Sequence, residues 1–427
     1  MASAEVRQRK PIDATELKDH STKPPTHPRL KHGIPMQVFR SLLMATWINC
    51  CCVVILATQL IGSPLYLINK EYYYSYMAFT KQNFALAITA LTQWGSPTLY
   101  RTSGDESIRG LLHISESGML QSQFPERLVL IANHQIYTDW IYLWWFAYTN
   151  AMHGRIFIIL KDSLRWVPVV GQGMMFYGFI FMARKWVSDK PRLAHRLGKL
   201  RTQHTGSQSS KSQYDPMWLL IFPEGTNLSI NTKRRSDAFG EKQGISPLKH
   251  QILPRSTGLF FCLQQLRGTV DWVYDSTIAY EGPPKGSYPD KYFTLRSTLI
   301  QGRPPTSVNM HWRRFAVADI PLDDQHEFEE WLRARWVEKD QLLDEFFETG
   351  RFPSQLAGSI EVKNGTKEQQ VAASAGYVEC NPSPGALERS AAVNKRLWLK
   401  RTATLPFTSS QNPKAATYFP ARQGSSE

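Results

Sequence analysis

A long apolar run near the N-terminus is the strongest pattern in the chain. Between Arg40 and Lys70, 29 consecutive residues carry no charge. About 20 apolar residues span the hydrocarbon core of a bilayer, so the run predicts a membrane helix over residues 41–67. A signal peptide is the alternative, but the run begins only after Arg40 and lacks a small-residue cleavage pattern.

A shorter apolar segment, Asn83–Tyr100, is interrupted by Gly95 and Pro97. At about 18 residues it is short for a span. It could lie in the interface or return as the second leg of a hairpin; the alternative is an amphipathic helix packed on the globular part. Residues 38–100 are therefore expected to form a membrane anchor.

Polar, low-complexity sequence flanks the rest of the chain. Residues 1–37 are basic and Pro-rich, which predicts a disordered arm. After Pro353 the chain is rich in Ser, Ala, Gly and Pro, and a disordered tail is expected over residues 351–427. Residues 101–350 remain as the folded domain.

Short apolar runs alternate with helical patterns from Leu128 to Arg314, which predicts an α/β domain with a mixed sheet flanked by helices. Asp323–Phe347 carries an apolar stripe at helical spacing and is expected to pack on the core at the end of the domain. Buried helix and strand are expected over Ile141–Ala147 and Gly173–Ala183. The expected strands are Arg127–Ala132, Arg155–Leu160, Met217–Phe222, Val273–Tyr280 and Ser307–Trp312.

Charge and cysteine content narrow the function classes. The chain has 427 residues and a net charge of +14, which favours an anionic partner: nucleic acid, an anionic membrane or a phosphorylated substrate. Its five cysteines include three consecutive ones, so a disulfide scaffold is excluded. Because no CxxC or Cys/His ligand spacing occurs, no metal site is expected.

The first candidate for chemistry is Asn133-His134, at the end of an apolar strand, with Asp139 following after four residues. On one ideal helix, residues five positions apart point about 140° apart, so the pair would not share a helix face. The two can meet if His134 lies on the loop and Asp139 in the first helical turn, with Thr138 as N-cap. The carboxylate could then hold one ring nitrogen and leave the other as a general base. A hydrogen-bonded surface pair is the alternative, and the lack of GxSxG argues against a hydrolase triad.

A second candidate is Phe222-Pro-Glu224-Gly225-Thr226, directly after a strand. A strand that ends in this way places a carboxylate and a glycine at the rim of a sheet, where α/β proteins bind ligands. The alternative is a simple turn.

Cations at the ends of apolar stretches form the third candidate. Lys161 follows one expected strand, and Gly178-x-x-Phe181-x-x-Arg184 follows a second apolar stretch. Arginine binds phosphate bidentately and lysine as a point charge. The alternative is that these cations only cap buried elements.

Together, in this order, the Asn-His-x4-Asp, Gly-x-x-Phe-x-x-Arg and Phe-Pro-Glu-Gly-Thr motifs resemble the glycerolipid acyltransferase family. Leu253–Gly258 is similar to the family's fourth motif, centred on Pro254, and the resemblance covers Leu128–Arg314. Three further stretches resemble a eukaryotic branch with the lysocardiolipin acyltransferases and the 1-acylglycerol-3-phosphate acyltransferases close to them: Asp275–Tyr280, Val308–Arg314 and Trp331–Leu343.

The resemblance implies a glycerol-3-phosphate-acyltransferase-like fold and acyl transfer from acyl-CoA to a lysophospholipid hydroxyl, without a metal, another cofactor or an acyl-enzyme. It implies that His134 is the general base and that Asp139 orients its ring. Arg184, with Lys161, would hold the acceptor phosphate, and backbone donors near Gly225 would stabilise the oxyanion. The other expected substrate-binding positions are Asn133, Gly178, Phe181, Glu224, Gly225, Thr226 and Pro254.

The acceptor stays open at this point. Lysophosphatidic acid is the first expectation; lysophosphatidylinositol, lysophosphatidylglycerol and lysocardiolipin are the alternatives. A catalytically inactive lipid-binding protein is a different class, against which the intact His134/Asp139 pair argues. Nucleic acid is not an expected partner, because the basic excess is spread along the chain without a binding motif. The expected partners are acyl-CoA, a lysophospholipid and the bilayer.

Charges around the first apolar run predict how the chain is oriented in the membrane. More cations precede it than closely follow it, which places the N-terminus in the cytosol. Acyl-CoA is a cytosolic donor, so His134 is expected on that side as well. Both expectations hold if the anchor is a hairpin or re-entrant segment. The endoplasmic reticulum membrane is the expected location, with a mitochondrial membrane as the alternative.

Overall fold

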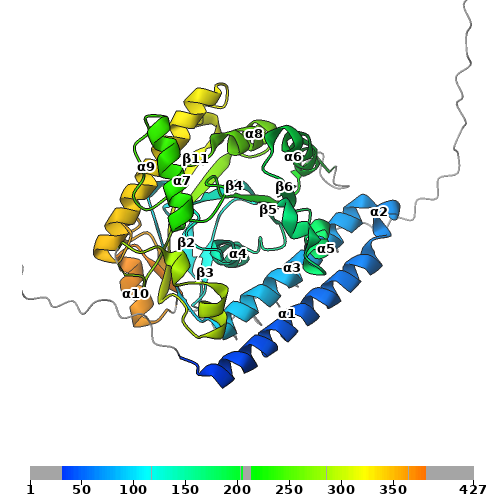
Figure 1. Cartoon of the computed structure of the whole chain (residues 1–427), viewed down its shortest axis with the longest axis horizontal. Helices are drawn as coiled ribbons and strands as arrows, with labels where there is room; N and C mark the ends of the chain where they lie inside the picture. The colour runs from blue at the N-terminus through cyan, green and yellow to red at the C-terminus, as the bar shows by residue number, and fades with distance from the viewer. Residues whose placement is uncertain are drawn as a thin grey trace, which may run out of the picture.

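An eight-stranded mixed sheet forms the centre of the molecule in the computed structural model, which describes residues 31–116, 118–201, 203–204, 213–284, 286–363 and 365–380. Helices cover both faces of the sheet (Figure 1), and the predicted α/β class is confirmed. In spatial order the strands are β13 (Val378–Cys380), β1 (Leu99–Gly104), β11 (Ser307–Ala316), β10 (Trp272–Tyr280), β4 (Arg127–Ala132), β9 (Met217–Ile221), β5 (Ile156–Lys161) and β6 (Ile180–Met182).

The part of the sheet from β4 to β6 is parallel. β9 pairs with both β4 and β5, and β6 pairs with β5. The carboxyl ends of these four strands therefore lie along one edge, where α/β folds place their ligand sites. The five strands predicted from the apolar runs all form, and β11 continues to Ala316.

Both faces of the sheet are buried, which explains the uninterrupted apolar runs. In β4, Leu128 and Leu130 belong to one core cluster, while Val129 and Ile131 belong to the other. The first face is covered by α3 (Lys70–Gly95), α4 (Asp139–Thr149) and α5 (Val170–Phe176), and the second by α6 (Trp186–Leu200), α8 (Ser256–Leu266) and α9 (Gln325–Thr349).

Smaller elements complete the described part of the chain. A helix, α7 (Ile230–Lys242), follows β9. A three-stranded sheet contains β12 (Glu361–Val362), β2 (Leu112–Ile114) and β3 (Leu120–Ser122), and β7 (Gln203–His204) pairs with β8 (Gln213–Tyr214). The single-turn helices are η1 (Glu106–Ile108), η2 (Asp162–Trp166), η3 (Pro289–Lys291), η4 (Arg296–Ile300) and η5 (Val317–Asp319).

The expected anchor forms a helical hairpin in which α1 (Ile34–Gly62) and α3 lie side by side (Figure 1), joined by the short α2 (Leu65–Ile68). The stretch Ile34–Ile68 is long and apolar enough to cross a membrane. The predicted bounds, 41–67 and 83–100, need correction. The first long helix starts before Arg40 and ends ahead of Pro64, and the second segment is divided between α3 and β1.

Polar side chains fix the hairpin to the domain. Near the start of α1, the Arg40 guanidinium donates to the carbonyl of Gly95 at 2.6 Å and to that of Leu299. In the middle of α3, the buried Lys81 ammonium donates to the Ile156 carbonyl of β5 at 2.8 Å. The outer face of α1, in contrast, leaves Leu42, Val54 and other apolar side chains exposed. Thus α3 is a layer of the domain, and α1 covers it from outside.

The C-terminal boundary of the domain lies beyond the predicted one. Residues 351–380 are not the start of a disordered tail: they form β12, α10 (Lys367–Ser374) and β13. β13 pairs with β1 at the edge of the main sheet, where Val378 and Cys380 are buried. The segment is rich in small residues, so its few core positions, spaced two apart, did not stand out as a strand pattern. Residues 381–427 lie outside the described part of the chain, as do residues 1–30 of the predicted arm.

We expect that a chain ending at Gly350 is much less stable than one ending at Cys380. The shorter chain loses β13 and uncovers β1, leaving its backbone groups unpaired at an open edge. Thermal unfolding of both proteins, purified in the same detergent, provides the measurement. Equal melting temperatures would show that residues 351–380 are dispensable for the fold.

Candidate active site

The predicted His134/Asp139 pair forms as the spacing requires. His134 lies on the loop after β4, and Asp139 is the first residue of α4. Nδ1 of His134 is 2.8 Å from Oδ2 of Asp139. Because a carboxylate can only accept, Nδ1 carries the proton and donates it, and the lone pair of Nε2 stays free. The imidazole also stacks on Phe222 at 4.4 Å between ring centroids.

Asp139 is completely buried, so its charge depends on the donors around it. Besides His134, the backbone N–H of Ile136 donates to Oδ2 at 3.0 Å, and the Tyr280 hydroxyl donates to Oδ1. Burial and the Asp139 charge raise the pKa of Tyr280 well above its ordinary value, which keeps the hydroxyl protonated. Thr138 occupies the N-cap position, as predicted, but its side chain makes no capping hydrogen bond.

Asn133 occupies a structural position rather than facing the open edge of the sheet. Its side chain donates to the Ile278 carbonyl at 3.0 Å and accepts from the Ile278 N–H at 2.7 Å. The side chain thus continues the pairing of β4 with β10 past Ser276, where the backbone ladder ends. This bridge holds the residue before His134 against the strand that carries Tyr280.

Glu224 lies behind the catalytic loop. The carboxyl group is buried, and Oε1 accepts the His134 backbone N–H at 3.2 Å and the Trp336 indole N–H at 3.3 Å. Burial raises the pKa of Glu224 well above its ordinary value. Glu224 therefore connects the loop to α9, a contact that the sequence pattern did not reveal.

One helical turn beyond Trp336, Lys339 makes a second buried connection. Its ammonium lies 2.5 Å from Oδ1 of Asp275 and donates to the Ser276 carbonyl at 2.7 Å. Arg313 on β11 binds the other oxygen of Asp275 at 2.8 Å. Burial lowers the pKa of Lys339 to about 8, with Asp275 opposing the shift. This charge network fixes α9 beneath Glu224, and only the family-like stretch Trp331–Leu343 pointed to it.

Arg184 reaches across the edge of the sheet to the Glu224 loop. Its guanidinium donates to the Gly225 carbonyl at 2.7 Å. The backbone of Arg184 has φ +65°, a left-handed conformation that costs a residue with a side chain roughly 1–2 kcal/mol. Asp189 holds this turn from both sides, because its carboxylate accepts the N–H of Ala183 at 2.9 Å and that of Lys185 at 3.0 Å.

A second arginine, which the motif comparison missed, flanks Gly225. A side chain added to Gly225 would lie 3.7 Å from Cδ and 3.8 Å from Nε of Arg255. The Arg255 N–H donates to the Pro223 carbonyl at 2.8 Å, which places the residue after Pro254 beside the Glu224 loop. In the described part of the chain its guanidinium is exposed and has no hydrogen bond or ion pair. Two guanidinium groups therefore surround an exposed glycine.

The remaining expected residues take different places. Lys161 is exposed at the end of β5, paired in register with Met182 of β6, and so lies at the same edge as Arg184. Phe181 is buried in β6, and Gly178 makes the left-handed turn before that strand. Thr226 and Pro254 are half-buried. The Gly225 N–H donates to the Phe222 carbonyl, so this group is not the free oxyanion donor.

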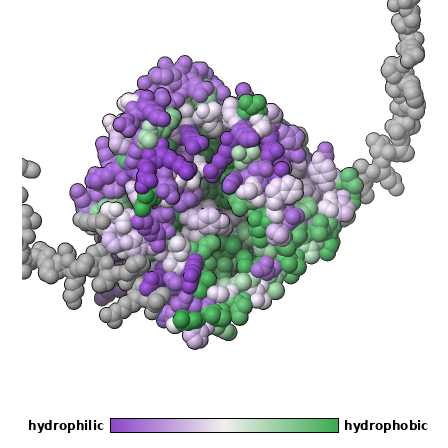
Figure 2. Space-filling view, viewed as in Figure 1, coloured by the Kyte–Doolittle hydropathy of each residue, from purple (hydrophilic) through white to green (hydrophobic). Residues whose placement is uncertain are grey.

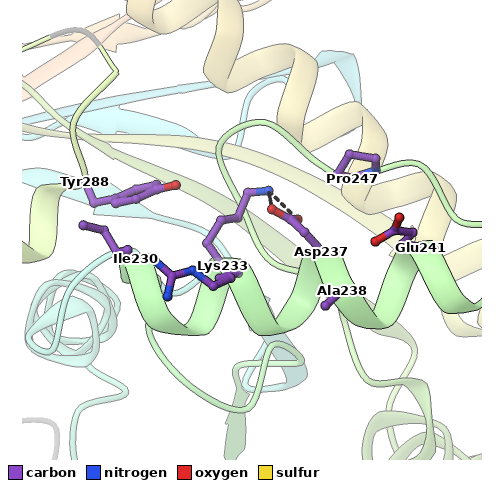
Figure 3. Close-up of a pocket in the computed structure, with 8 residues that line it drawn as sticks. Ile230, Lys233, Asp237, Ala238, Glu241, Pro247 and Tyr288 are labelled. Atoms are coloured by element: carbon purple, nitrogen blue, oxygen red, sulfur yellow. Dashed lines mark hydrogen bonds and ion pairs between the residues drawn. The ribbon is translucent and has the colours of Figure 1, made fainter.

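A cavity of about 690 Å³ lies along α7, outside the set of expected residues. Figure 3 shows the Lys233 ammonium directed at the Asp237 carboxylate, 2.5 Å away, so its charge is compensated. Glu241 adds a negative charge to the wall. The lining residues are Ile230, Lys233, Arg234, Asp237, Ala238, Glu241, Pro247 and Tyr288. This balance of charges gives the cavity little preference for a phosphate.

Across the described residues, no group of three His, Cys, Asp or Glu side chains is arranged to hold a metal ion.

Comparison with known proteins agrees with this geometry. The family described as Acyltransferase matches residues 113–281, and the one described as Acyltransferase C-terminus matches residues 298–373. An uncharacterised acyltransferase of Schizosaccharomyces pombe is 40% identical over 301 residues, which cover 70% of this chain and 83% of the relative. The 2-acyl-1-lysophosphatidylinositol acyltransferase of Saccharomyces cerevisiae is 35% identical over 354 residues, which cover 77% and 89%. Lysocardiolipin acyltransferase 1 of Gallus gallus is 33% identical over 237 residues, which cover 55% and 58%.

The chain belongs to the glycerolipid acyltransferase family and is an acyltransferase enzyme.

The position of Glu224 gives a prediction that separates support of the loop from contact with the substrate. Glu224→Gln keeps an acceptor for the N–H groups of His134 and Trp336, so kcat is expected within about threefold of wild type. Glu224→Ala leaves these two buried donors unpaired, at a cost of about 1–3 kcal/mol each, and a larger loss of activity is expected. Steady-state acyl transfer by the purified proteins is the measurement. An equal loss in both variants would instead mean that the charge of Glu224 acts on the substrate.

The same variants test the pKa shift. A carboxyl whose folded pKa is raised adds stability that is complete below its ordinary value of 4.5 and is lost as pH rises toward the folded pKa. Glu224→Gln has no such group. Its melting temperature is therefore expected to fall less than that of wild type between acidic and neutral pH.

Proposed function

We propose that this enzyme transfers a fatty acyl group from acyl-CoA to the free hydroxyl of a lysophospholipid at a membrane surface. The observation that carries the proposal is the buried Asp139 carboxylate on Nδ1 of His134, which leaves Nε2 as the base. The His134 backbone N–H contacts Glu224, and the two arginines flank the next residue, Gly225. A general base next to an anion-binding group suits a nucleophilic hydroxyl on a molecule that also carries a phosphate.

The proposed step needs no metal or other cofactor. Nε2 of His134 takes the proton of the acceptor hydroxyl as the hydroxyl oxygen forms a bond to the thioester carbon. Asp139 stabilises the imidazolium that results. The carbon–sulfur bond then breaks, and the proton passes from His134 to the CoA sulfur. The products are the diacyl phospholipid and free CoA, and no acyl-enzyme forms.

Arg184 and Arg255 are proposed to bind the acceptor phosphate, with Lys161 contributing from the next strand end. Guanidinium groups bind phosphate oxygens in pairs, and the lack of a side chain at Gly225 lets the phosphate approach the backbone between them. The strained turn at Arg184 directs its side chain to this place.

For the acceptor head group we propose inositol first. The Saccharomyces cerevisiae relative, whose name specifies lysophosphatidylinositol, is matched over 89% of its length. Lysophosphatidic acid is the second candidate, since the probable 1-acyl-sn-glycerol-3-phosphate acyltransferase 5 of Arabidopsis thaliana is 33% identical over 54% of this chain. A panel of lysophospholipids, assayed with acyl-CoA and purified enzyme, ranks them by kcat/KM.

The hairpin is proposed to lie in one leaflet without crossing it. α3 is attached to β5 through Lys81 and packs in the protein core, so it is not a lipid-facing span. α1 exposes an apolar outer face, and Figure 2 shows apolar surface gathered along the α1 side of the molecule and polar surface over the opposite side. We propose that the N-terminus and His134 both lie on the cytosolic side of the endoplasmic reticulum membrane, which an anchor that does not cross the bilayer allows.

Replacement of the base tests the mechanism. His134→Ala is expected to reduce kcat by about 10²–10⁴-fold, because general-base catalysis is lost. Asp139→Asn should lose activity as well, since its amide can favour the wrong ring tautomer. The control is His326→Ala, an exposed histidine on α9. Near-normal turnover of a folded His134→Ala enzyme would refute the assignment.

The two arginines should act mainly on acceptor binding. Arg184→Ala and Arg255→Ala are each expected to raise KM for the lysophospholipid about tenfold or more, the effect of losing a hydrogen bond to a charged group. Lysine should not restore it, because the paired donors are missing. Arg267→Ala, on the surface and paired with Asp323, is the matched control. A rise in KM for acyl-CoA alone would contradict the phosphate assignment.

Sealed microsomes test the orientation. The sequons at Asn227 and Asn364 are glycosylated only if they reach the lumen, so no glycan is expected at either. Added protease should digest the catalytic domain, while a lumenal glycoprotein in the same preparation stays intact. A glycan on Asn364, or protection of the domain, would mean that the chain crosses the membrane once.

A further inference from the structure

A cavity of about 240 Å³ lies between the tip of the hairpin and the amino ends of the parallel strands. Its walls include Tyr66, Tyr73 and Tyr74 from α2 and α3, and Arg196 and Lys199 from α6. We call it the hairpin pocket. Arg127, the first residue of β4, also lines it, whereas His134 follows the other end of that strand. Six strand residues span about 20 Å, so the pocket is separate from the catalytic edge.

The hairpin pocket is strongly cationic. Its lining residues include five cations and one carboxylate, that of Asp215; the cations are Lys81, Arg127, Arg155, Arg196 and Lys199. For two of them the hydrogen bonds in the described structure go to neutral oxygens. Lys81 donates to the carbonyls of Ile156 and Tyr177, and the Arg127 guanidinium donates to the carbonyls of Thr269 and Leu200 and to the Thr269 hydroxyl, among others. These neutral acceptors satisfy the N–H groups but do not cancel the net charge. The pocket therefore favours an anion.

The charge of Lys81 is coupled to what the pocket holds. It is 2% exposed, and its burial, with the nearby Arg155, lowers its pKa well below the ordinary value. An anion in the pocket would supply an opposite charge and so favour the protonated form of Lys81. The three tyrosines add neutral donors: burial raises the pKa of Tyr73 and of Tyr74, so both hydroxyls keep their protons.

The surroundings of the pocket indicate the kind of anion. The hairpin tip next to Tyr66 exposes Ile61, Leu67 and Ile68, each more than three-quarters accessible. An apolar surface beside a cationic, tyrosine-lined pocket matches a molecule with an anionic head and an apolar tail. Tyrosine and basic side chains at the boundary of an apolar surface are typical of contacts with lipid head groups.

We propose that the hairpin pocket binds the phosphate of an anionic glycerophospholipid, with the acyl chains lying against the exposed apolar residues of the hairpin tip. Arg196 and Lys199 contact the phosphate oxygens, and the three tyrosines donate hydrogen bonds to the head group. The bound lipid is neither acceptor nor product of the reaction, because it lies at the opposite end of the sheet from His134. It connects the hairpin tip to α6 and stabilises the attachment of the anchor to the domain.

The test uses the full-length enzyme, purified in a neutral detergent, without acyl-CoA. Its melting temperature is measured against increasing dihexanoylphosphatidylglycerol, dihexanoylphosphatidylcholine and inorganic phosphate, each in separate titrations. We expect the anionic lipid to stabilise the enzyme at lower concentration than either control ligand. In Arg196→Ala/Lys199→Ala, the concentration needed should rise about tenfold, as expected for losing hydrogen bonds to a charged group.

Two further variants locate the response. Lys242→Ala removes a cation on α7, away from the pocket lining, and should respond like wild type. Arg184→Ala should also keep the response, because the phosphate proposed to bind there is that of the acceptor. If Arg184→Ala loses the response and the double variant keeps it, the lipid binds at the catalytic edge and the proposal is wrong.

Equal stabilisation by phosphatidylcholine would refute the preference for an anion, and equal stabilisation by inorganic phosphate would refute a lipid ligand. Because no turnover is measured, these outcomes do not depend on the proposed acyl transfer. An inactive enzyme that still shows the response would leave the pocket assignment intact.

Discussion

The buried carboxylate of Asp139 is the constraint on which the active site depends. An ionised carboxylate without contact with water is stable only if hydrogen bonds surround it. Three donors do so, from His134, Ile136 and Tyr280, and they come from the loop after β4 and from β10. The fold must therefore keep β4 and β10 side by side as far as their ends. The two hydrogen bonds between Asn133 and Ile278 extend the pairing of these strands up to the loop that carries His134. Asn133 thus positions the loop that carries His134 through its hydrogen bonds with Ile278.

The parts that the sequence predicted are those with local signals. Continuous apolar runs predicted β4, β5 and β9, since strands buried on both faces need no polar alternation. The spacing of His134 and Asp139 predicted a loop followed by a helix start, and this is what forms. The contacts of Glu224 and Lys339 could not be predicted in this way, because they join residues far apart in the chain. Helical periodicity alone does not identify Lys339: a lysine beside an apolar stripe is expected to face solvent, whereas the fold places it against Asp275.

The predicted domain boundaries were wrong for a related reason. Residues 351–380 have the composition of a tail, yet Val378 and Cys380 fill the edge of the core once β1 is in place. Amino-acid composition indicates how much apolar surface a segment can bury by itself. It does not include the contacts that the segment gains by pairing with a strand already in place. The anchor shows the opposite effect. Its length and apolar content describe a span, but hydrogen bonds of Arg40 and Lys81 attach α1 and α3 to the domain. In the proposed arrangement, only the outer side of α1 faces lipid.

Arg184 shows why backbone strain is retained beside the Glu224 loop. Glycine would adopt φ +65° at little cost, but glycine has no guanidinium, and the position needs both the turn and the side chain. The two hydrogen bonds from Asp189, which flank the strained residue, offset the cost, each contributing about 1 kcal/mol or more because the acceptor is charged. Since Asp189 is buried and lies within the first turn of α6, that helix and the arginine are fixed as one unit. The guanidinium is then aimed at Gly225 before any substrate arrives, and little side-chain entropy is left to lose when a phosphate binds.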